Sequence, residues 1–220
     1  ASTYTLPAEL RQRGFRRFGF HGINHQHVAE TVAAQWQQQG RDPKKLRLIS
    51  AHLGAGASLA AIKGGVCIDT TMGYTPLEGL VMASRCGSVD PGLLLELMRE
   101  GMGAAQLADL LQQQAGLKGL SGLSGDMRDI REQAAAGHQG AQLALDVFRQ
   151  RLLQLIGAMA ASLQGADVLA LTGGIGEHDQ ALRSELEEAL AWLPNLEMVI
   201  VPADEEGMIA RLCRRSAAVG

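Results

Sequence analysis

Hydrophobic and polar positions follow one another in an order that predicts a β-meander, then helices alternating with two more strands. Short apolar runs of strand length occur at five places: 46–51, 58–63, 66–69, 167–172 and 198–201. Only Gly64-Gly65 separates the second run from the third, which is typical of a two-residue hairpin turn. The run at 167–172 is continuously apolar, which indicates a strand buried on both faces.

Apolar residues that recur every three or four positions predict helices between and after these strands. The predicted helices are 24–39, a segment from Pro91, 104–115, a polar segment ending at Ala136, 139–164, 179–192 and a final segment after Asp204. Asn24 and Asp204 are expected to cap the first and last of them. The longest helix carries an apolar stripe and should lie across one sheet face. The remaining stretches, 1–20, 70–90 and 116–125, are predicted to be loops. The glycine-rich loop 116–125 is expected to be flexible.

Composition is that of an ordinary globular protein, with 46% hydrophobic and 20% charged residues among 220. A net charge of −3 and only 4% aromatic residues argue against nucleic acid and membrane surfaces as partners. The three cysteines (Cys67, Cys86 and Cys213) form no CxxC pair, so we expect a reducing compartment, the cytoplasm. No signal peptide or membrane-spanning run is found, and the first residues resemble the middle of a longer chain.

Two glycine-rich turns predict a nucleotide site. Gly54-Ala55-Gly56 follows the first strand, where glycines let the backbone approach a phosphate and present N–H groups to it. An ordinary tight turn is the alternative for this motif alone. Gly173-Gly174-Ile175-Gly176 ends the strand at 167–172 and opens a helix, a usual way to place a nucleotide at the carboxyl end of a sheet. Together the turns predict phosphates at the first and adenosine at the second.

The order of elements is typical of the ribonuclease-H-like core of actin, Hsp70 and sugar kinases, an α/β domain with a mixed sheet flanked by helices. Six motifs, taken in order, resemble those of the acetate kinase family: Phe18-Gly-Phe-His-Gly-Ile-Asn-His, Ala51-His-Leu-Gly-Ala-Gly, Ser84-Arg-Cys-Gly-Ser-Val-Asp-Pro-Gly, Ser124-Gly-Asp-Met-Arg-Asp-Ile, Thr172-Gly-Gly-Ile-Gly-Glu-His and Pro202-Ala-Asp-Glu-Glu-Gly-Met-Ile-Ala. The resemblance covers nearly the whole chain.

This resemblance implies reversible transfer of the ATP γ-phosphate to acetate or another short carboxylate, with Mg²⁺, by a homodimer of two-domain subunits. Residues 1–220 would be the nucleotide-binding C-terminal part. The N-terminal domain, which carries an acceptor-binding arginine and a catalytic aspartate, is expected to precede Ala1. Two alternatives stay open: a non-catalytic nucleotide-binding or dimerisation fragment, and a kinase for propionate or butyrate.

The resemblance also assigns roles to residues. His21, as an imidazolium, and Arg85 would stabilise the transferring phosphoryl group. The phosphate turn would be His52, Leu53, Gly54, Ala55 and Gly56. The segment near base and ribose would be Asp126, Met127 and Arg128. The adenosine turn would be Gly174, Ile175, Gly176, Glu177 and His178. Glu205 would hold Mg²⁺.

Other readings of these residues are open on the sequence alone. The spacing of His21, His25 and His27 also fits part of a zinc site, although no fourth ligand is placed for it. Arg85 could form a surface ion pair, and Glu205 stands where a helix N-terminus favours an acidic residue. The chain departs from the family pattern at Ala55 and His178, where asparagine is usual. It also departs at Ile23-Asn24, at Ser88 and in a short 192–198 segment.

Overall fold

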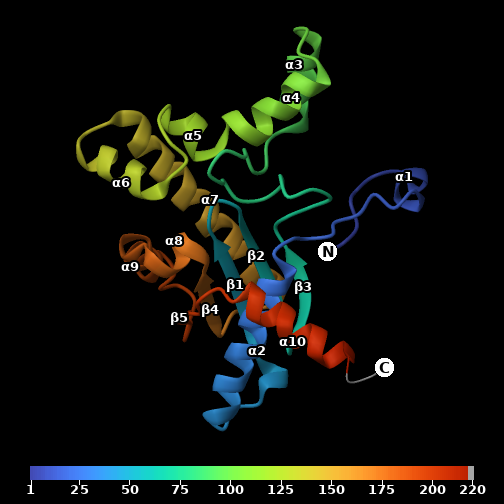
Figure 1. Cartoon of the computed structure of the whole chain (residues 1–220), viewed down its shortest axis with the longest axis vertical. Helices are drawn as coiled ribbons and strands as arrows, with labels where there is room; N and C mark the ends of the chain where they lie inside the picture. The colour runs from blue at the N-terminus through green and yellow to red at the C-terminus, as the bar shows by residue number, and fades with distance from the viewer. Residues whose placement is uncertain (218–220) are drawn as a thin grey trace.

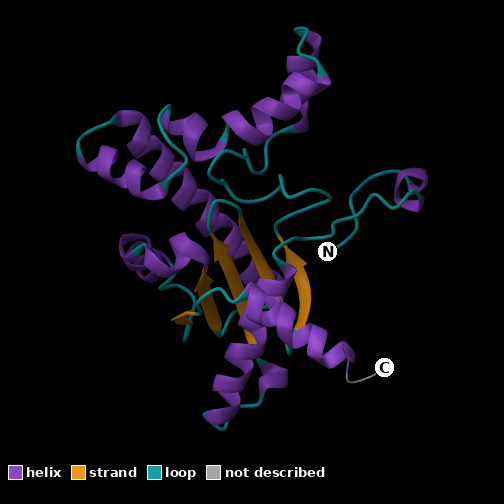
Figure 2. Cartoon of the chain, viewed as in Figure 1, coloured by secondary structure: helices purple, strands orange, loops and turns teal. Residues whose placement is uncertain are grey.

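A five-stranded mixed sheet forms the centre of the molecule (Figures 1 and 2). This computed structural model describes residues 1–217. The spatial order is β3-β2-β1-β4-β5, with strands β1 (Arg47–Leu53), β2 (Ala57–Lys63), β3 (Val66–Thr70), β4 (Val168–Thr172) and β5 (Glu197–Ile200). The first three strands form the antiparallel meander, and β4 and β5 continue the sheet parallel to β1. All five predicted strands are confirmed, with small differences at their ends.

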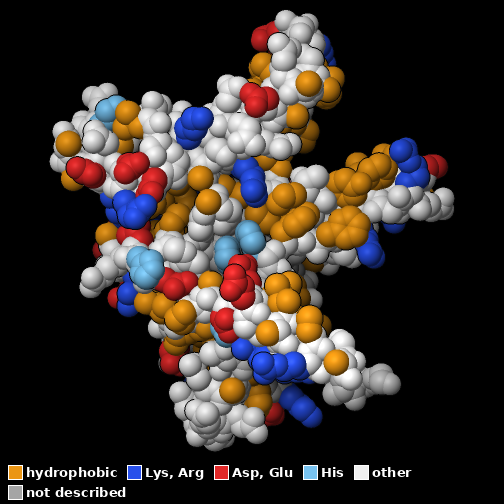
Figure 3. Space-filling view, viewed as in Figure 1, with side chains coloured by type: hydrophobic (Ala, Val, Ile, Leu, Met, Phe, Trp, Pro, Cys, Tyr) orange, Lys and Arg blue, Asp and Glu red, His pale blue; other side chains and the backbone are white. Residues whose placement is uncertain are grey.

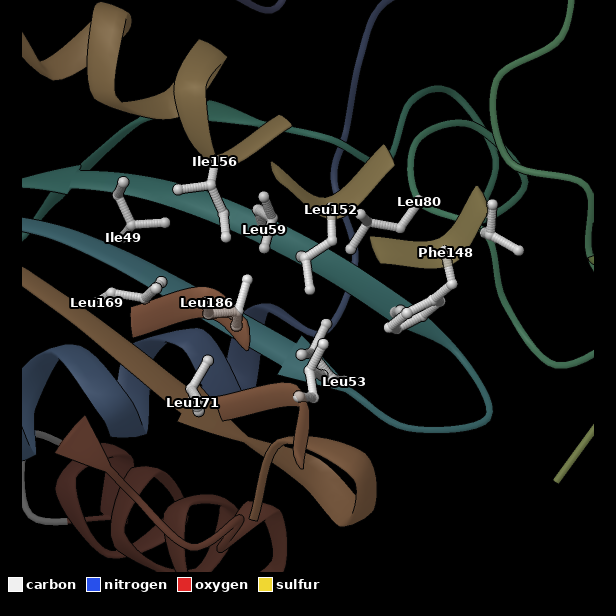
Figure 4. Packing of buried hydrophobic residues seen from close by; sticks show 14 of the residues in the cluster. Ile49, Leu53, Leu59, Leu80, Phe148, Leu152, Ile156, Leu169, Leu171 and Leu186 are labelled. Carbon is white, nitrogen blue, oxygen red and sulfur yellow. The ribbon is translucent and has the colours of Figure 1, made fainter. Parts of the chain in front are cut away.

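Both faces of the central strands are buried, which explains their apolar character. Side chains alternate across a strand, so Ile49 of β1 faces one layer and Leu48 the other. On the Ile49 face, the sheet packs against α7 (Gln139–Leu163) and α9 (Gln180–Ala189) through a cluster that Figure 4 shows from close by. On the Leu48 face it packs against α2 (Gly22–Gln38), which contributes Val28, Val32 and Trp36. The prediction that the longest helix crosses the sheet is therefore confirmed.

The other helices lie around the ends of the sheet. They are α1 (Ala8–Gln12), the 3₁₀ turn η1 (Pro43–Lys45), α3 (Pro91–Arg99), α4 (Ala104–Asp109), the π-helical turn η2 (Leu110–Gln114), α5 (Gly116–Ser121), α6 (Met127–Ala135), α8 (Gly173–His178) and α10 (Glu205–Ala217). In Figure 1, α3 and α1 project away from the body, whereas α6 lies above α8 and α9.

Several helix boundaries differ from the prediction. The segment 116–125 is not wholly a loop, because its glycines permit close packing: Gly116 has φ +63°, and a Cβ there would clash with the Met82 carbonyl. Leu117 is consequently buried and α5 forms. Residues 1–20 contain α1, and 104–115 divides into α4 and η2. Asp204 caps α10 as predicted, its Oδ1 accepting from Gly207 N at 3.1 Å.

Two differences fall on the site itself. Asn24 does not cap α2. The helix begins at Gly22 with His21 in the cap position, and the Asn24 side chain is fully buried beneath it. The predicted adenosine turn is itself helical, since α8 begins at Gly173 directly after β4.

Candidate functional site

Two histidine rings lie stacked where β1 ends and α2 begins. The rings of His21 and His52 are 4.1 Å apart between centroids and inclined by 19°. His21 has φ 56°, a left-handed conformation that only a few per cent of residues other than glycine adopt. A backbone held in such a conformation at a cleft is a common mark of a functional site.

The phosphate turn lies directly beside these rings. A Cβ on Gly56 would lie 3.2 Å from His21 Nε2 and 3.5 Å from Arg85 Nη1, and one on Gly54 would lie 3.7 Å from His52 Nε2. Arg85 is held there by its Nη1, which donates to the Pro76 carbonyl at 3.2 Å. The structure thus brings both predicted phosphoryl-stabilising side chains to the turn that was predicted to bind phosphates.

Buried hydroxyl and amide groups form hydrogen bonds to the ring nitrogens that face the protein interior. Ser58 Oγ lies 2.9 Å from His21 Nδ1 and 2.8 Å from His25 Nε2, and His25 Nδ1 lies 2.8 Å from Ser50 Oγ. Asn24 Nδ2 donates to His52 Nδ1 at 2.8 Å. Both ring nitrogens of His25 are therefore engaged by serines, which leaves neither of them for the zinc site considered above.

Burial lowers the pKa of these histidines. The pKa of His21 falls to about 4 and that of His25 to about 3, chiefly because burial disfavours the charged ring. The pKa of His52 is also lowered by burial, against an opposing effect of the Glu205 and Glu177 carboxylates. Without a bound phosphate, the lowered pKa favours the neutral ring of His21 near pH 7, whereas the sequence predicts an imidazolium beside phosphoryl oxygens.

The second glycine turn meets the first. Gly173 has φ +79°, and a Cβ on it would lie 2.8 Å from the Leu53 carbonyl oxygen, so α8 starts in direct contact with the end of β1. Beyond this contact lies a cavity of about 600 Å³. It is lined by Gly54, Ala55, Gly125, Asp126, Met127, Arg128, Arg131, Gly174, Ile175, His178, Asp179 and Gln180. Eight residues predicted for nucleotide binding therefore line one cavity.

The other predicted binding residues lie outside the cavity wall. Leu53 and Gly176 are buried in the packed interior. Glu177 Oε1 accepts hydrogen bonds from Gly173 N at 2.9 Å and Ala203 N at 3.0 Å, so it ties α8 to the segment before α10. His52 and Gly56 belong to the phosphate turn, as described above.

The residues Gly125, Arg131, Asp179 and Gln180 line the cavity and were missed by the sequence analysis. Arg131 Nε donates to Asp179 Oδ2 at 2.7 Å, linking α6 to the start of α9, and Asp179 Oδ1 also accepts from Leu182 N at 3.0 Å. Helical periodicity could have identified Arg131, because it lies four residues after Met127 on the same face. Asp126 caps α6 and pairs with Arg128 at 2.6 Å; these hydrogen bonds lower the pKa of its carboxyl to about 2.

Acidic groups lie on the other side of the rings. Glu205 is exposed in the first turn of α10. The negative charges of the Glu205 and Glu177 carboxylates favour the protonated His52 ring and so oppose the lowering of its pKa. Figure 3 shows histidine side chains near the middle of this face, with acidic groups below them and a basic group above. Residues 1–217 contain no group of three or more metal-ligating side chains. A single carboxylate still fits Mg²⁺, which retains most of its waters and takes further ligands from phosphates.

Comparison with known proteins agrees with this geometry. The sequence model of the Acetokinase family matches residues 1–206. The chain therefore belongs to the acetokinase family. It is 52% identical over 184 residues to the acetate kinase of Synechococcus sp. (strain JA-2-3B'a(2-13)), covering 84% of this chain and 45% of the relative. It is 50% identical over 193 residues to that of Acaryochloris marina, covering 88% and 47%.

Solved structures of the family have the same fold. The crystal structure of Porphyromonas gingivalis acetate kinase aligns with a TM-score of 0.90 at 37% identity, over 96% of this chain and 58% of that one. A propionate kinase from Francisella tularensis aligns with a TM-score of 0.86 at 32% identity, over 95% and 58%. The predicted actin, Hsp70 and sugar-kinase fold is thus confirmed. The acetokinase chain described here spans about half the length of the curated relatives it matches.

The helices of residues 1–217 include none that is both long enough and apolar enough to cross a membrane.

Proposed function

We propose that this chain is the nucleotide-binding part of an ATP-dependent kinase that phosphorylates acetate or another short carboxylate. The observation that carries the proposal is the meeting of two glycine turns on one cavity, with His21 and Arg85 beside the first turn. Adenosine would occupy the cavity between α6 and α8. The phosphates would extend along Gly54–Gly56 toward the rings.

Phosphoryl transfer requires positioning and neutralisation of charge more than covalent chemistry by the protein. A carboxylate oxygen of the acceptor attacks the γ-phosphorus, the bond to the β,γ-bridging oxygen breaks, and ADP leaves with that oxygen. The Arg85 guanidinium would offset negative charge on the phosphoryl oxygens. The neutral ring of His21 would donate one hydrogen bond to the same oxygens. Glu205 would hold Mg²⁺, which when bound neutralises charge on the phosphates.

The acceptor side of the reaction is assigned to the other half of the protein. The matched relatives are about twice as long as this chain, and residues 1–220 supply the nucleotide cavity. An isolated chain would then bind nucleotide without turnover. The homodimer stays a prediction from the family resemblance, and the cytoplasmic location stays a prediction from the cysteine pattern.

A propionate-type acceptor is the second candidate, favoured by the similarity to the Francisella tularensis propionate kinase. The length of the acyl chain would depend on a pocket in the other half. A non-catalytic nucleotide-binding or dimerisation fragment stays open as an alternative. Absence of ADP binding would count against each of these candidates except a fragment that serves dimerisation alone.

Isothermal titration with ADP tests the proposal. We expect binding to the wild-type chain, and affinity about tenfold or more lower in Gly174→Leu. A Cβ on Gly174 meets no other atom of residues 1–217 within 4 Å, so the leucine would extend into the cavity that Gly174 lines. Gly157→Leu is the matched control, because its Cβ is equally free and Gly157 does not line the cavity. No heat with millimolar ADP, or equal loss in both variants, would contradict the proposal.

A further inference from the structure

We propose that Ser50, His25 and Ser58 are positioning residues that fix His21 in the tautomer with its proton on Nε2. The inference rests on the proposed function only for the acceptor of that proton, which would be a phosphoryl oxygen beside Gly56. The tautomer itself follows from the hydrogen-bond arrangement beneath the ring.

Four side chains form an unbranched chain of contacts from the interior to the phosphate turn. Ser50 Oγ lies 2.8 Å from His25 Nδ1, His25 Nε2 lies 2.8 Å from Ser58 Oγ, and Ser58 Oγ lies 2.9 Å from His21 Nδ1. Ser50 and Ser58 are fully buried and His25 is 6% exposed. Because the two serine hydroxyls are fully buried, they depend on the neighbouring ring nitrogens for their hydrogen bonds.

Each serine hydroxyl has a single hydrogen, and each neutral imidazole has one N–H and one bare nitrogen. Burial lowers the pKa of both rings, which keeps them neutral near pH 7. Ser58 Oγ has two lone pairs and could accept from both rings, but its own buried hydrogen would then lack an acceptor. With Ser58 donating to one ring, the contacts can run in two directions. In one, Ser50 donates to His25 Nδ1, His25 Nε2–H donates to Ser58, and Ser58 donates to His21 Nδ1. In the other, every donor and acceptor is exchanged.

Only the first direction uses every buried hydrogen. In the reverse direction, Ser50 would accept from His25 and its own hydroxyl hydrogen would need another acceptor. Within residues 1–217, the Ser50 side chain contacts no polar partner except His25. A buried donor left without a partner costs about 1–3 kcal/mol, whereas the first direction leaves none. It also leaves the proton of His21 on Nε2.

This placement has a chemical consequence at the turn. His21 Nε2 is the atom that lies 3.2 Å from the Cβ position of Gly56, beside Arg85 Nη1. With Nε2–H, two donors lie within 3.5 Å of the same point beside Gly56. With the proton on Nδ1, a lone pair would face the phosphoryl oxygens and repel them. The serine–histidine chain thus determines whether the ring attracts or repels the transferring group.

Ring ¹⁵N NMR of the histidine-labelled 220-residue chain at pH 7.5 tests the assignment, because protonated and bare ring nitrogens have well-separated shifts. We expect bare Nδ1 and protonated Nε2 in both His21 and His25. A protonated Nδ1 in either ring would overturn the proposal. A purely structural role for the serines would not require this pattern.

The same NMR measurement on the Ser58→Ala variant is the second test. Without Ser58, either tautomer of His25 leaves one buried hydrogen unpaired, so His25 and His21 are each expected to populate both tautomers. Unchanged shifts of both rings would overturn the proposal. Ser162→Ala, at a more exposed serine that donates to Asp69, is the control and should change neither ring. Should Ser58→Ala not fold, the tautomer pattern of the wild-type chain decides the proposal by itself.

ADP titration of the same wild-type sample separates this inference from the proposed function. If both rings carry Nε2–H but neither ADP nor ATP moves the His21 signals, the tautomer assignment stands and the proposed function fails. If the nucleotide shifts His21 Nε2 while Nδ1 is the protonated atom, the proposed function stands and the tautomer assignment fails.

Discussion

At the scale of single residues, the site depends on neutral histidines held in a strained and buried setting. His21 occupies the left-handed region at the start of α2, and its ring stacks on His52. Buried serines and Asn24 fix the ring nitrogens that face the interior. The nitrogens that face the phosphate turn remain free to meet a ligand. Stability and ligand recognition are therefore linked through the same side chains.

Stability should fall with acid in a defined window. The folded-state pKa values of His21 and His25 lie at about 4 and about 3, below the ordinary 6.5, so the unfolded chain takes up protons first. The histidine contribution is complete above pH 6.5 and is lost as pH falls from 6.5 toward 4. Urea unfolding at pH 7.5, 6, 5 and 4 should show a falling midpoint. A midpoint independent of pH over this range would contradict the buried neutral state.

Removing the His25 ring checks that assignment. His25→Leu should weaken the pH dependence, because one buried ring no longer titrates. It should also lower stability near pH 7, since Ser50 and Ser58 lose their partner. An unchanged slope against pH would assign the effect to other groups.

At the scale of elements, the cavity exists because β1, α8 and α6 converge on one end of the sheet. β4 runs parallel to β1 with Thr172 opposite His52, so the turns after both strands leave the sheet at the same edge. Gly173 then brings α8 against Leu53. The Arg131–Asp179 pair joins α6 to α9 across the cavity, in addition to a 3.3 Å contact of Arg131 with Glu185.

Gly173→Ala should destabilise the junction of β4 and α8. Its φ of +79° is unfavourable for alanine, and the new Cβ would lie 2.8 Å from the Leu53 carbonyl oxygen. We expect a loss of about 2 kcal/mol or more in the free energy of unfolding. The neighbouring change Gly174→Ala is the control. It meets no described atom within 4 Å and should raise helix stability by up to about 1 kcal/mol. Similar results for both would contradict the packing described.

Arg131→Gln should loosen the cavity wall. Asp179 is 8% exposed in its side chain and would lose its ionic partner, although it would still cap α9. We expect a loss of about 1–2 kcal/mol in unfolding free energy and ADP affinity several-fold lower by calorimetry. Arg99→Gln removes an exposed ion pair with Glu96 and should change stability by less than about 0.5 kcal/mol. Equal ADP affinity in wild type and Arg131→Gln would refute a role for the link.

At the scale of the whole molecule, the chain has a complete sheet core yet spans about half the length of its relatives. Two buried clusters cover the two faces of the sheet. The fold therefore has a hydrophobic interior of its own. The chemistry attributed to the family needs an acceptor site that we assign to the other half.

We expect the isolated chain to bind ADP but to make no acyl phosphate from ATP, Mg²⁺ and acetate. A hydroxamate assay, with full-length Porphyromonas gingivalis acetate kinase as the positive control, measures this. Turnover by the isolated chain would place the acceptor site within residues 1–220 and overturn the assignment of halves.

The sequence by itself determined the elements whose signals are local. The strands were predictable because their apolar runs are short and bounded by glycine, proline or charged residues, and the hairpin at Gly64-Gly65 depends only on its neighbours. The motif order was enough to indicate the family, since the match spans residues 1–206. The sequence could not predict α5, because Gly116 is required by contact with the distant Met82 carbonyl and not by a flexible loop.

Tertiary structure alone decided how the site works. Asn24 contacts His52 and does not cap a helix, although the two residues are separated by 28 positions in the sequence. Arg131 pairs with Asp179 across a separation of 48 positions. Such residues become neighbours only in the folded chain. The pKa of His21 is likewise beyond the reach of local sequence, since it depends on burial by segments far along the chain. Local sequence encodes propensity, whereas burial, tautomer and cavity shape arise from through-space contacts that only the fold creates.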